Sequence, residues 1–303
     1  MFMNCIREIK EIFKKTEQIN FITFAELSEC IRKNLHKLPS DIDLIVGVPR
    51  SGIIPAYMLA LFLNKNVCSL TEFINNLTFD KGERPLNESV KNGQKKVLIV
   101  DDSIFSGNAL ARTKRKLENI NRNYEIIFLS VFALEESKNY VDYYFQIVPS
   151  PRLFQWNYMN HYFLEKSCVD IDGVLCVDPT YEQNDDGEKY IDFCLNAKPL
   201  YIPSYEIHSL VTSRLEKYRL QTEEWLRKHN VKYKNLYMLD LPDAQSRRNL
   251  NIHGNFKAEI YSKLKDTMLF IESEPHQAKQ IAELTNKPCI CVSTDEFFGG
   301  VKK

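Results

Sequence analysis

Two apolar runs that each lead into a pair of aspartates limit most strongly what this chain can fold into. The first is V-L-I-V-D-D, residues 97–102, and the second is C-V-D-I-D-G, residues 168–173. Apolar runs without polar alternation are typical of strands buried on both faces, and therefore of parallel sheets covered by helices. Open parallel sheets bind ligands at the carboxyl ends of their strands. The two pairs of acids therefore predict two ligand sites in one α/β chain.

The remaining sequence supports two such domains, since 303 residues correspond to about two domains. Helical periodicity covers residues 1–20 and 23–37, and Thr23 with Glu26 forms a capping box at the start of the second helix. The further expected elements are strand 43–48, helix 53–63, strand 97–101, helix 108–118, strand 125–132, strand 166–170, strand 208–212, helix 217–228, strand 235–239, helix 255–264, strand 267–271, helix 275–285 and strand 288–292. This order predicts two mainly parallel sheets flanked by helices.

A polar stretch and an aromatic stretch interrupt the alternation of strands and helices. Residues 70–95 are polar and broken by glycine and proline, which predicts a long mobile loop. Residues 140–162 are crowded with aromatic side chains, and they are interpreted either as a hydrophobic hinge or as the wall of a binding site. We place the domain boundary behind this stretch, with one domain over residues 1–162 and a second over residues 163–303.

Composition excludes several classes of protein. Lys plus Arg and Asp plus Glu number 40 each, so no overall field attracts nucleic acid or an anionic membrane. No run of about twenty apolar residues predicts a transmembrane segment, and the N-terminus has the pattern of an amphipathic helix rather than a signal peptide. The eight cysteines form no C-x-x-C pair, so we expect free thiols in a cytoplasmic protein. Cys289 and Cys291 should face the core from one strand.

The loop behind the first acidic pair indicates what that pair does. Asp101 and Asp102 end a strand, and S-I-F-S-G-N, residues 103–108, leads into a helix. Backbone N–H groups of such a turn bind phosphate without a cation, and Gly107 allows close approach. Adjacent carboxylates suit the hydroxyls of a sugar ring and positive charge that develops on it. From spacing alone, an acidic strand end with a capped helix explains the pattern equally well.

These residues resemble the phosphoribosyl pyrophosphate (PRPP) loop of type I phosphoribosyltransferases, in which four apolar residues precede two acids and a small-residue loop. V-G-V-P-R-S-G-I, residues 46–53, resembles the pyrophosphate loop of the same family. Phe105 departs from the family, which usually has a small residue at that position. The resemblance implies that PRPP is bound by Arg50, Ser51, Gly52, Asp101, Asp102, Ser103, Ile104, Phe105, Ser106, Gly107 and Asn108.

The resemblance also implies how these residues share the work. Asp101 and Asp102 would contact the ribose hydroxyls as catalytic residues, and residues 103–108 would hold the 5-phosphate. Lys81 and Arg84 lie where the family has a loop that closes over pyrophosphate, although surface charge explains them as well.

The acceptor of the phosphoribosyl group would bind under a hood that lies outside the core sheet in this family. The aromatic segment Phe154, Gln155 and Trp156, with Tyr158, is the best local candidate, and Phe154 and Trp156 are the expected acceptor-binding residues. Aromatic faces stack on bases and on sugar rings, so the segment does not choose between these acceptors.

The second acidic pair suits phosphoryl chemistry. Asp170 and Asp172 close a strand, so one carboxylate can attack phosphorus while the other serves as general acid and base. Gly173 allows the turn that brings them together. D-I-D-G-V-L, residues 170–175, resembles the first motif of haloacid-dehalogenase-like (HAD) phosphatases, whose domain is Rossmann-like.

The later motifs of that family follow in order, and the resemblance implies their roles. Thr212 would hydrogen-bond the transferring phosphoryl group, and Lys257, or less plausibly Lys263, would offset charge on the phosphoaspartate. Many members have two adjacent aspartates where this chain has Glu272 and Ser273, which leaves the metal ligands open. The expected cofactor is Mg²⁺, which would be bound by Asp170, Asp172, Glu272 and Glu274.

The two resemblances together predict a bifunctional enzyme with a small cap over its second site, since only about forty residues separate Asp172 from Thr212. It would transfer 5-phosphoribosyl from PRPP to a large acceptor, a glycan or lipid-linked oligosaccharide in polysaccharide assembly, and hydrolyse the 5-phosphate to leave a ribofuranosyl group. One alternative is a nucleobase phosphoribosyltransferase joined to a nucleotidase, and another is a PRPP-sensing regulatory protein. The anomeric outcome and the oligomeric state stay open.

Overall fold

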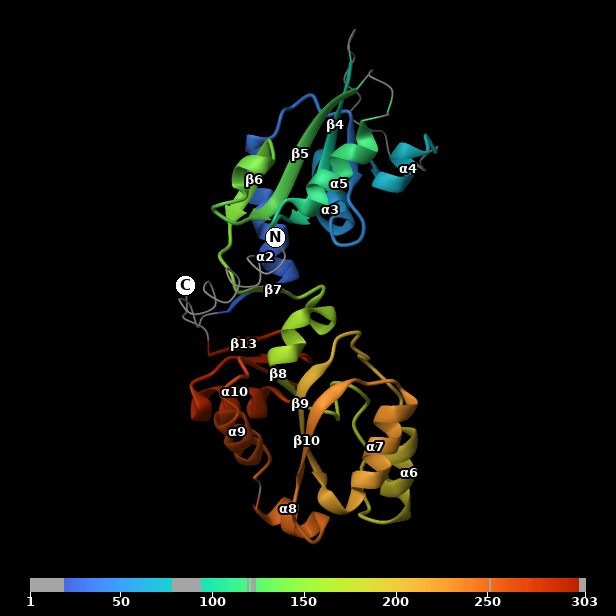
Figure 1. Cartoon of the computed structure of the whole chain (residues 1–303), viewed down its shortest axis with the longest axis vertical. Coiled ribbons are helices and arrows are strands. Elements are labelled where there is room, and N and C mark those ends of the chain that lie inside the picture. The colour runs from blue at the N-terminus through green and yellow to red at the C-terminus, as the bar shows by residue number, and fades with distance from the viewer. Residues whose placement is uncertain (1–18, 78–93, 119, 121–123, 251, 300–303) are drawn as a thin grey trace. The chain divides into compact units, whose positions relative to one another are not determined.

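A computed structural model describes residues 19–77, 94–118, 120, 124–250 and 252–299. Among the described residues, the chain divides into an N-terminal unit, Asn20–Trp156, and a C-terminal unit that contains the residues from Asn157 onward together with Ile19. The division falls inside the aromatic stretch 140–162. Each unit has an α/β fold of its own, as expected from the sequence (Figure 1).

A five-stranded parallel sheet with the order β3-β2-β4-β5-β6 forms the centre of the N-terminal unit. Its strands are β2 (Leu44–Gly47), β3 (Asn66–Ser69), β4 (Lys95–Ser103), β5 (Tyr124–Ala133) and β6 (Tyr143–Ile147). Its helices are α2 (Phe24–Asn34), α3 (Ile53–Leu63), α4 (Leu70–Ile74) and α5 (Asn108–Leu117). A small parallel pair joins β1 (Asn20–Ile22) to β7 (Arg152–Phe154).

Strand β4 is buried on both faces, as its apolar run predicts. Leu98 and Val100 belong to a core that includes residues of α2 and α3. Val97 and Ile99 belong to a second core that includes residues of α4 and α5. The helices therefore cover both faces of the sheet and leave the carboxyl ends of its strands for the loops that follow them.

The C-terminal unit contains a six-stranded sheet with the order β10-β9-β8-β11-β12-β13, in which only the edge strand β13 is antiparallel. Its strands are β8 (Ser167–Val169), β9 (Ile207–Leu215), β10 (Tyr233–Leu239), β11 (Leu269–Glu272), β12 (Cys289–Cys291) and β13 (Phe297–Phe298). Its helices are α6 (Glu188–Asn196), α7 (Arg219–Lys228), α8 (Ala244–Leu250), α9 (His253–Lys263) and α10 (Pro275–Thr285). Helices α9 and α10 lie on one side of the sheet, and α6 and α7 lie on the other (Figure 1). Short 3₁₀ turns span residues 35–37, 138–140, 158–160, 162–166 and 216–218.

Several local predictions are confirmed. Thr23 caps α2, with Glu26 completing the capping box, and helix α3 has the expected bounds, residues 53–63. Cys289 and Cys291 are both buried in β12. The seven cysteines among the described residues are free. No helix within the described ranges is long and apolar enough to cross a membrane.

Other local predictions are wrong or lie outside the described residues. The expected loop 70–95 begins as helix α4, because Ser69 and Glu72 form a second capping box that the sequence interpretation overlooked. Helix α6 was not expected, although it lies in the segment where a small cap was predicted. Residues 1–18 of the expected first helix and residues 78–93 of the expected loop are not described.

Candidate active sites

The order of the strands brings the two loops of the N-terminal unit together. Strand β2 pairs with β4, with Gly47 opposite Val100, so the segment after β2 lies beside the acids that end β4. The Val48 amide donates to the carbonyl of Val100 at 2.9 Å and extends this pairing by one residue. The Ser51 hydroxyl then donates to Oδ1 of Asp102 at 2.9 Å. Two predicted PRPP-binding segments therefore meet at the carboxyl edge of the sheet.

Gly52 allows this close packing of the loop on strand β4. A Cβ atom at Gly52 would lie 2.7 Å from the carbonyl oxygens of Val48 and Val100 and 2.9 Å from Cα of Asp101. These neighbours are backbone atoms, which cannot move aside as a flexible side chain can. Only glycine therefore fits where the first loop crosses the strand that carries the acidic pair.

Trp156 is a polar partner of the acidic pair as well as an aromatic surface. Its indole Nε1 donates to Oδ2 of Asp102 at 2.7 Å, so both oxygens of this buried carboxylate accept a hydrogen bond. The indole ring stacks on Phe154, with ring centroids 4.9 Å apart and an angle of 21° between the planes. Phe154 in turn stacks on Phe132 in the core. The aromatic segment therefore holds Asp102 in a fixed orientation.

The acceptor-binding prediction needs correction in two places. Phe154 is only 6% exposed and belongs to the core, so its ring supports Trp156 and offers no face to a ligand. Tyr158 is equally buried and belongs to the C-terminal unit. The prediction for Trp156 remains, because its ring is only partly buried and also contacts the exposed Phe24 at 5.5 Å.

Asp101 lies in surroundings that disfavour its ionised form. Burial and the neighbouring charge of Asp102 raise the pKa of Asp101 to about 8. Its Oδ1 accepts the backbone N–H of Asp102 at 3.0 Å. An acid of this kind is ready to share a proton with a hydroxyl at neutral pH.

The small-residue loop after the acids surrounds a cavity of about 160 Å³ that Asp101 and residues 103–107 line together. Gly107 begins α5 with φ +74°, a conformation that glycine adopts without strain. Residues 103–108 were predicted to hold the 5-phosphate, but the backbone N–H of Ile104 donates to the carbonyl of Phe132 at 2.9 Å and is not free for a phosphate. The Phe105 side chain is exposed, and so are Ser106 and Asn108.

Three further residues were predicted for this site. Arg50 is exposed in the loop after β2. Lys81 and Arg84 lie outside the described residues.

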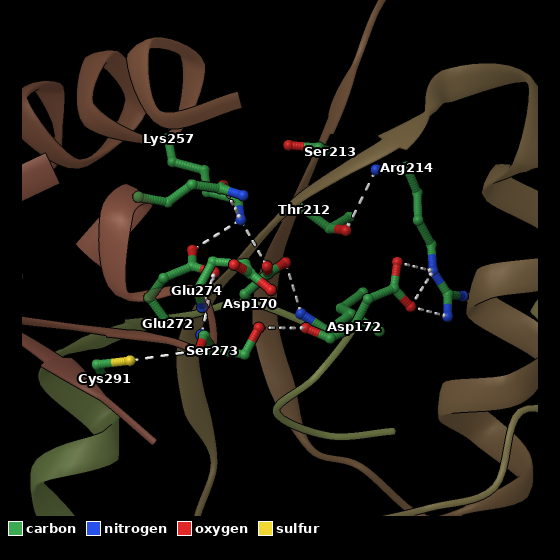
Figure 2. Close-up of polar contacts among 12 residues, drawn as sticks. Asp170, Asp172, Thr212, Ser213, Arg214, Lys257, Glu272, Ser273, Glu274 and Cys291 are labelled. Atoms are coloured by element: carbon green, nitrogen blue, oxygen red, sulfur yellow. Dashed lines mark hydrogen bonds and ion pairs between the residues drawn. The ribbon is translucent and has the colours of Figure 1, made fainter. Parts of the chain in front are cut away.

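In the C-terminal unit, Lys257 joins the first and last acids of the predicted phosphatase motifs (Figure 2). Its Nζ donates to Oδ2 of Asp170 at 2.5 Å, to Oε2 of Glu272 at 2.7 Å and to Oε1 of Gln277 at 3.0 Å. All three charged side chains are buried. The sheet order explains this contact, because β8 and β11 are neighbours and present Asp170 and Glu272 at the same edge. Lys263 is exposed on α9 and pairs with Glu259 instead.

This cluster holds two carboxylates and one ammonium, so it carries an excess negative charge in a buried place. Burial raises the pKa of Asp170 to about 7. The charge of Lys257 lowers this pKa, and the like charge of Glu272 raises it further. Burial alone would lower the pKa of Lys257, but the charges of Asp170 and Glu272 raise it. The cluster therefore favours any further cation or proton that enters it.

Asp172 binds a different partner from Asp170, although the sequence predicted that the two carboxylates act together on one phosphoryl group. Its Oδ1 accepts from Nη2 of Arg214 at 2.6 Å, and its oxygens also accept from Nε at 3.1 and 3.2 Å (Figure 2). Arg214 has no exposed side-chain surface. Nothing in the motifs used above pointed to Arg214, although it stands two residues after Thr212 on β9.

The predicted catalytic groups of this unit line one cavity of about 150 Å³. Thr212 is buried at its wall. The remaining members of the lining include Asp178, Arg247 and His253, which sequence reasoning did not select. The lining residues named so far in the motifs are Asp170, Asp172, Thr212, Lys257, Glu272 and Glu274.

The residues fit the expected Mg²⁺ only in part. In the part of the chain that the structure describes, no three His, Cys, Asp or Glu side chains converge as a ready metal site. The buried excess charge of Asp170 and Glu272 nevertheless suits Mg²⁺, which is commonly held by one or two carboxylates with water and substrate phosphate. Asp172 is turned to Arg214, so the predicted ligand set reduces to Asp170 and Glu272, with Glu274 beside them.

Comparison with known proteins supports the interpretation of the N-terminal unit. Residues 15–162, just under half of the chain, match the family model described as "Phosphoribosyl transferase domain". The match ends at residue 162, so the phosphatase prediction rests on the residues alone. No curated protein is significantly similar to the chain.

Solved phosphoribosyltransferase structures are similar to the chain at low scores. A purine phosphoribosyltransferase from Pyrococcus horikoshii Ot3 is 22% identical, with a TM-score of 0.35, over 46% of this chain and 94% of that one. A Helicobacter pylori xanthine-guanine-hypoxanthine phosphoribosyltransferase is 18% identical, with a TM-score of 0.34, over 46% and 91%.

Proposed function

We propose that the chain transfers a 5-phosphoribosyl group from PRPP to an acceptor in its N-terminal unit and removes the 5-phosphate in its C-terminal unit. One observation carries the proposal: in each unit, an aspartate at the carboxyl end of a strand accepts a hydrogen bond from a residue of another predicted motif of the same site. Ser51 contacts Asp102 in the first unit, and Lys257 contacts Asp170 in the second. The match of residues 15–162 to the phosphoribosyltransferase family model supports the first step.

In the first step, the bond between C1 of the ribose and pyrophosphate breaks, and pyrophosphate leaves with the electron pair. The acceptor hydroxyl attacks C1 from the opposite face and loses its proton to solvent. Asp102 stabilises the positive charge that develops on the ring and is held in place by Trp156 and Ser51, while Asp101 shares its proton with a ribose hydroxyl. Backbone N–H groups of the loop around Gly107 bind the 5-phosphate.

In the second step, an oxygen of Asp170 attacks phosphorus, the bond from phosphorus to O5 breaks, and Asp172 protonates the leaving O5. A water that gives its proton to Asp172 then releases phosphate from Asp170. Lys257 offsets the negative charge of the attacking carboxylate from 2.5 Å. Mg²⁺, held by Asp170 and Glu272, would reduce the repulsion between carboxylate and phosphate.

The acceptor is proposed to be large, a glycan or lipid-linked oligosaccharide in polysaccharide assembly. Between Asp172 and β9 the unit has one helix, α6, so the insertion beside the second site is small. The net product of the two steps is an unphosphorylated ribofuranosyl group, which suits a polymer. Nucleotide salvage, by contrast, keeps the phosphate.

The experiment compares products by mass spectrometry after incubation with PRPP, Mg²⁺ and either an oligosaccharide acceptor or a purine base. Asp170→Asn should accumulate a phosphoribosylated product, and Asp102→Asn should give no transfer. Asp192→Asn, on the exposed surface of α6, serves as the matched control and should behave as wild type. A final product from Asp170→Asn that equals the wild-type product would contradict the coupled mechanism.

The same experiment separates the two alternatives. A nucleoside formed from the purine base would favour a nucleobase transferase joined to a nucleotidase. PRPP binding without release of pyrophosphate from any acceptor would favour a sensor.

A further inference from the structure

The second cavity needs a positively charged donor for a phosphoryl group, because its walls are rich in carboxylates. Asp170, Asp172, Asp178, Glu272 and Glu274 all line it. A phosphate dianion entering such a place meets like charges, and charge-assisted hydrogen bonds from cations compensate for this repulsion. The question is which lining residue provides a cationic N–H.

Lys257 has no donor to spare. An ammonium group has three N–H bonds, and those of Lys257 are directed to Asp170, Glu272 and Gln277. His253 is not a cation at neutral pH, because burial and the charges of Arg247 and Lys257 lower its pKa. Among the described residues that line the cavity, Arg247 is the cation that remains.

Arg247 is fixed in place by two of its three nitrogen atoms. Its Nη1 donates to the carbonyl of Ser213 at 3.0 Å, and its Nη2 donates to Oδ1 of Asn184 at 3.1 Å. The residue is 7% exposed, and its Nε is buried with no hydrogen-bond partner among the described residues. A guanidinium has five N–H bonds, so Nη1 and Nη2 of this rigid cation each keep a second N–H, and Arg247 can be the donor that the cavity otherwise lacks.

We propose that Arg247 of helix α8 is a phosphate-binding residue of the C-terminal unit, with an N–H of its guanidinium donating to an oxygen of the phosphoryl group. This inference deepens the proposed function and rests on it for the identity of the site. It assigns to α8, which none of the predicted motifs includes, a direct part in binding the phosphate monoester. The neighbouring Ser213 carbonyl ties this donor to the strand that carries Thr212.

The test measures binding of inorganic phosphate to the full chain by isothermal titration calorimetry in the presence of Mg²⁺. Arg247→Gln should weaken phosphate binding by about 10- to 100-fold, the effect of losing a hydrogen bond between charged groups. Arg227→Gln is the matched control, because Arg227 is exposed and lies outside the cavity, and it should bind within twofold of wild type. Binding by Arg247→Gln within threefold of wild type overturns the proposal.

A second measurement does not depend on the folding of the variant. In ¹⁵N-labelled wild-type protein, titration with phosphate should shift one buried arginine Nε–H signal in the NMR spectrum. No shift of any such signal, or no phosphate binding by the wild type, overturns the inference.

Activity toward p-nitrophenyl phosphate, measured separately, decides the proposed phosphatase function. A hydrolytically active wild type with normal phosphate binding by Arg247→Gln leaves the function intact and removes only the role of Arg247. A wild type that hydrolyses nothing, but loses phosphate binding on Arg247→Gln, removes the phosphatase function and leaves the role of Arg247 in binding phosphate.

Discussion

Asp172 and Arg214 form a buried ion pair in which Nε and Nη2 of the arginine both donate to the carboxylate, with the closest contact at 2.6 Å. Thr222 and Cys176 complete the surroundings of the guanidinium. The carboxylate is thus turned away from Lys257 and Asp170. To protonate a leaving oxygen beside Asp170, Asp172 has to leave Arg214, so this arginine sets the resting position of the proposed general acid.

The Asp172–Arg214 pair should matter for stability as well. Removing one partner of a buried pair leaves an uncompensated charge, so Arg214→Met should lower the free energy of unfolding by about 3 kcal/mol. Arg227 offers a matched control, because it contacts Glu224 at the same 2.6 Å but is 74% exposed, whereas Arg214 is 0% exposed. Arg227→Met should change the free energy by less than about 1 kcal/mol. Urea denaturation measures both, and equal effects would show that burial does not strengthen the pair.

The pKa of Asp101 predicts a pH-dependent stability of the N-terminal unit. Its folded pKa of about 8 lies above the usual value of an aspartate, so the folded state holds the proton more strongly. Its contribution to stability is therefore complete at low pH and is lost as the pH rises toward 8. Asp101→Asn cannot ionise, and it should melt several degrees higher than wild type at pH 8.5, with a smaller gain at pH 5.

Glu29 provides the control for this measurement, because its pKa is lowered by the hydrogen bond and charge of Lys33. Glu29→Gln should therefore give no gain in melting temperature at pH 8.5. A melting temperature of Asp101→Asn that follows wild type across the whole range would mean that Asp101 is ionised in the folded protein.

Trp156 should act on PRPP more than on the acceptor. Trp156→Phe keeps a ring for stacking on Phe154 but removes the N–H that binds Asp102. A hydrogen bond to a charged group contributes about 1.5–3 kcal/mol, so kcat/KM for PRPP should fall at least tenfold while KM for the acceptor changes less. Steady-state release of pyrophosphate measures both constants. Tyr57→Phe, at an exposed position on α3, is the control. A change in KM for the acceptor, with kcat/KM for PRPP unchanged, would disprove the positioning role of Trp156.

The sequence was sufficient for the elements whose signals are local. Thr23 with Glu26 marks the start of α2, and the apolar runs mark the buried strands β4 and β5. Ser69 with Glu72 carries the same capping signal as Thr23, but polar residues after it favoured a loop. The strands β1 and β7 were not predicted, because three-residue strands that pair across 132 positions leave no periodic pattern.

In the candidate sites, too, local features were predicted from the sequence and features that depend on tertiary contacts were not. Spacing along the chain predicted that Asp101 and Asp102 lie at the carboxyl end of a strand, where β4 indeed has them, and sheet order then placed Ser51 beside Asp102. The orientation of a side chain depends on tertiary neighbours that spacing does not contain. Thus Asp172 faces Arg214, and Phe154 lies in the core, where the sequence had placed both in binding sites.

The contact of Gly52 with strand β4 has a consequence for the size of the ligand. Backbone oxygens on both sides of this residue leave no room for a methyl group, so the interval between the first loop and the acidic pair is set by the peptide chain itself. This fixed distance selects ligands by the separation of their two binding groups. A molecule whose leaving group and sugar ring are spaced differently could contact the loop after β2 or the acidic pair of β4, but not both at once.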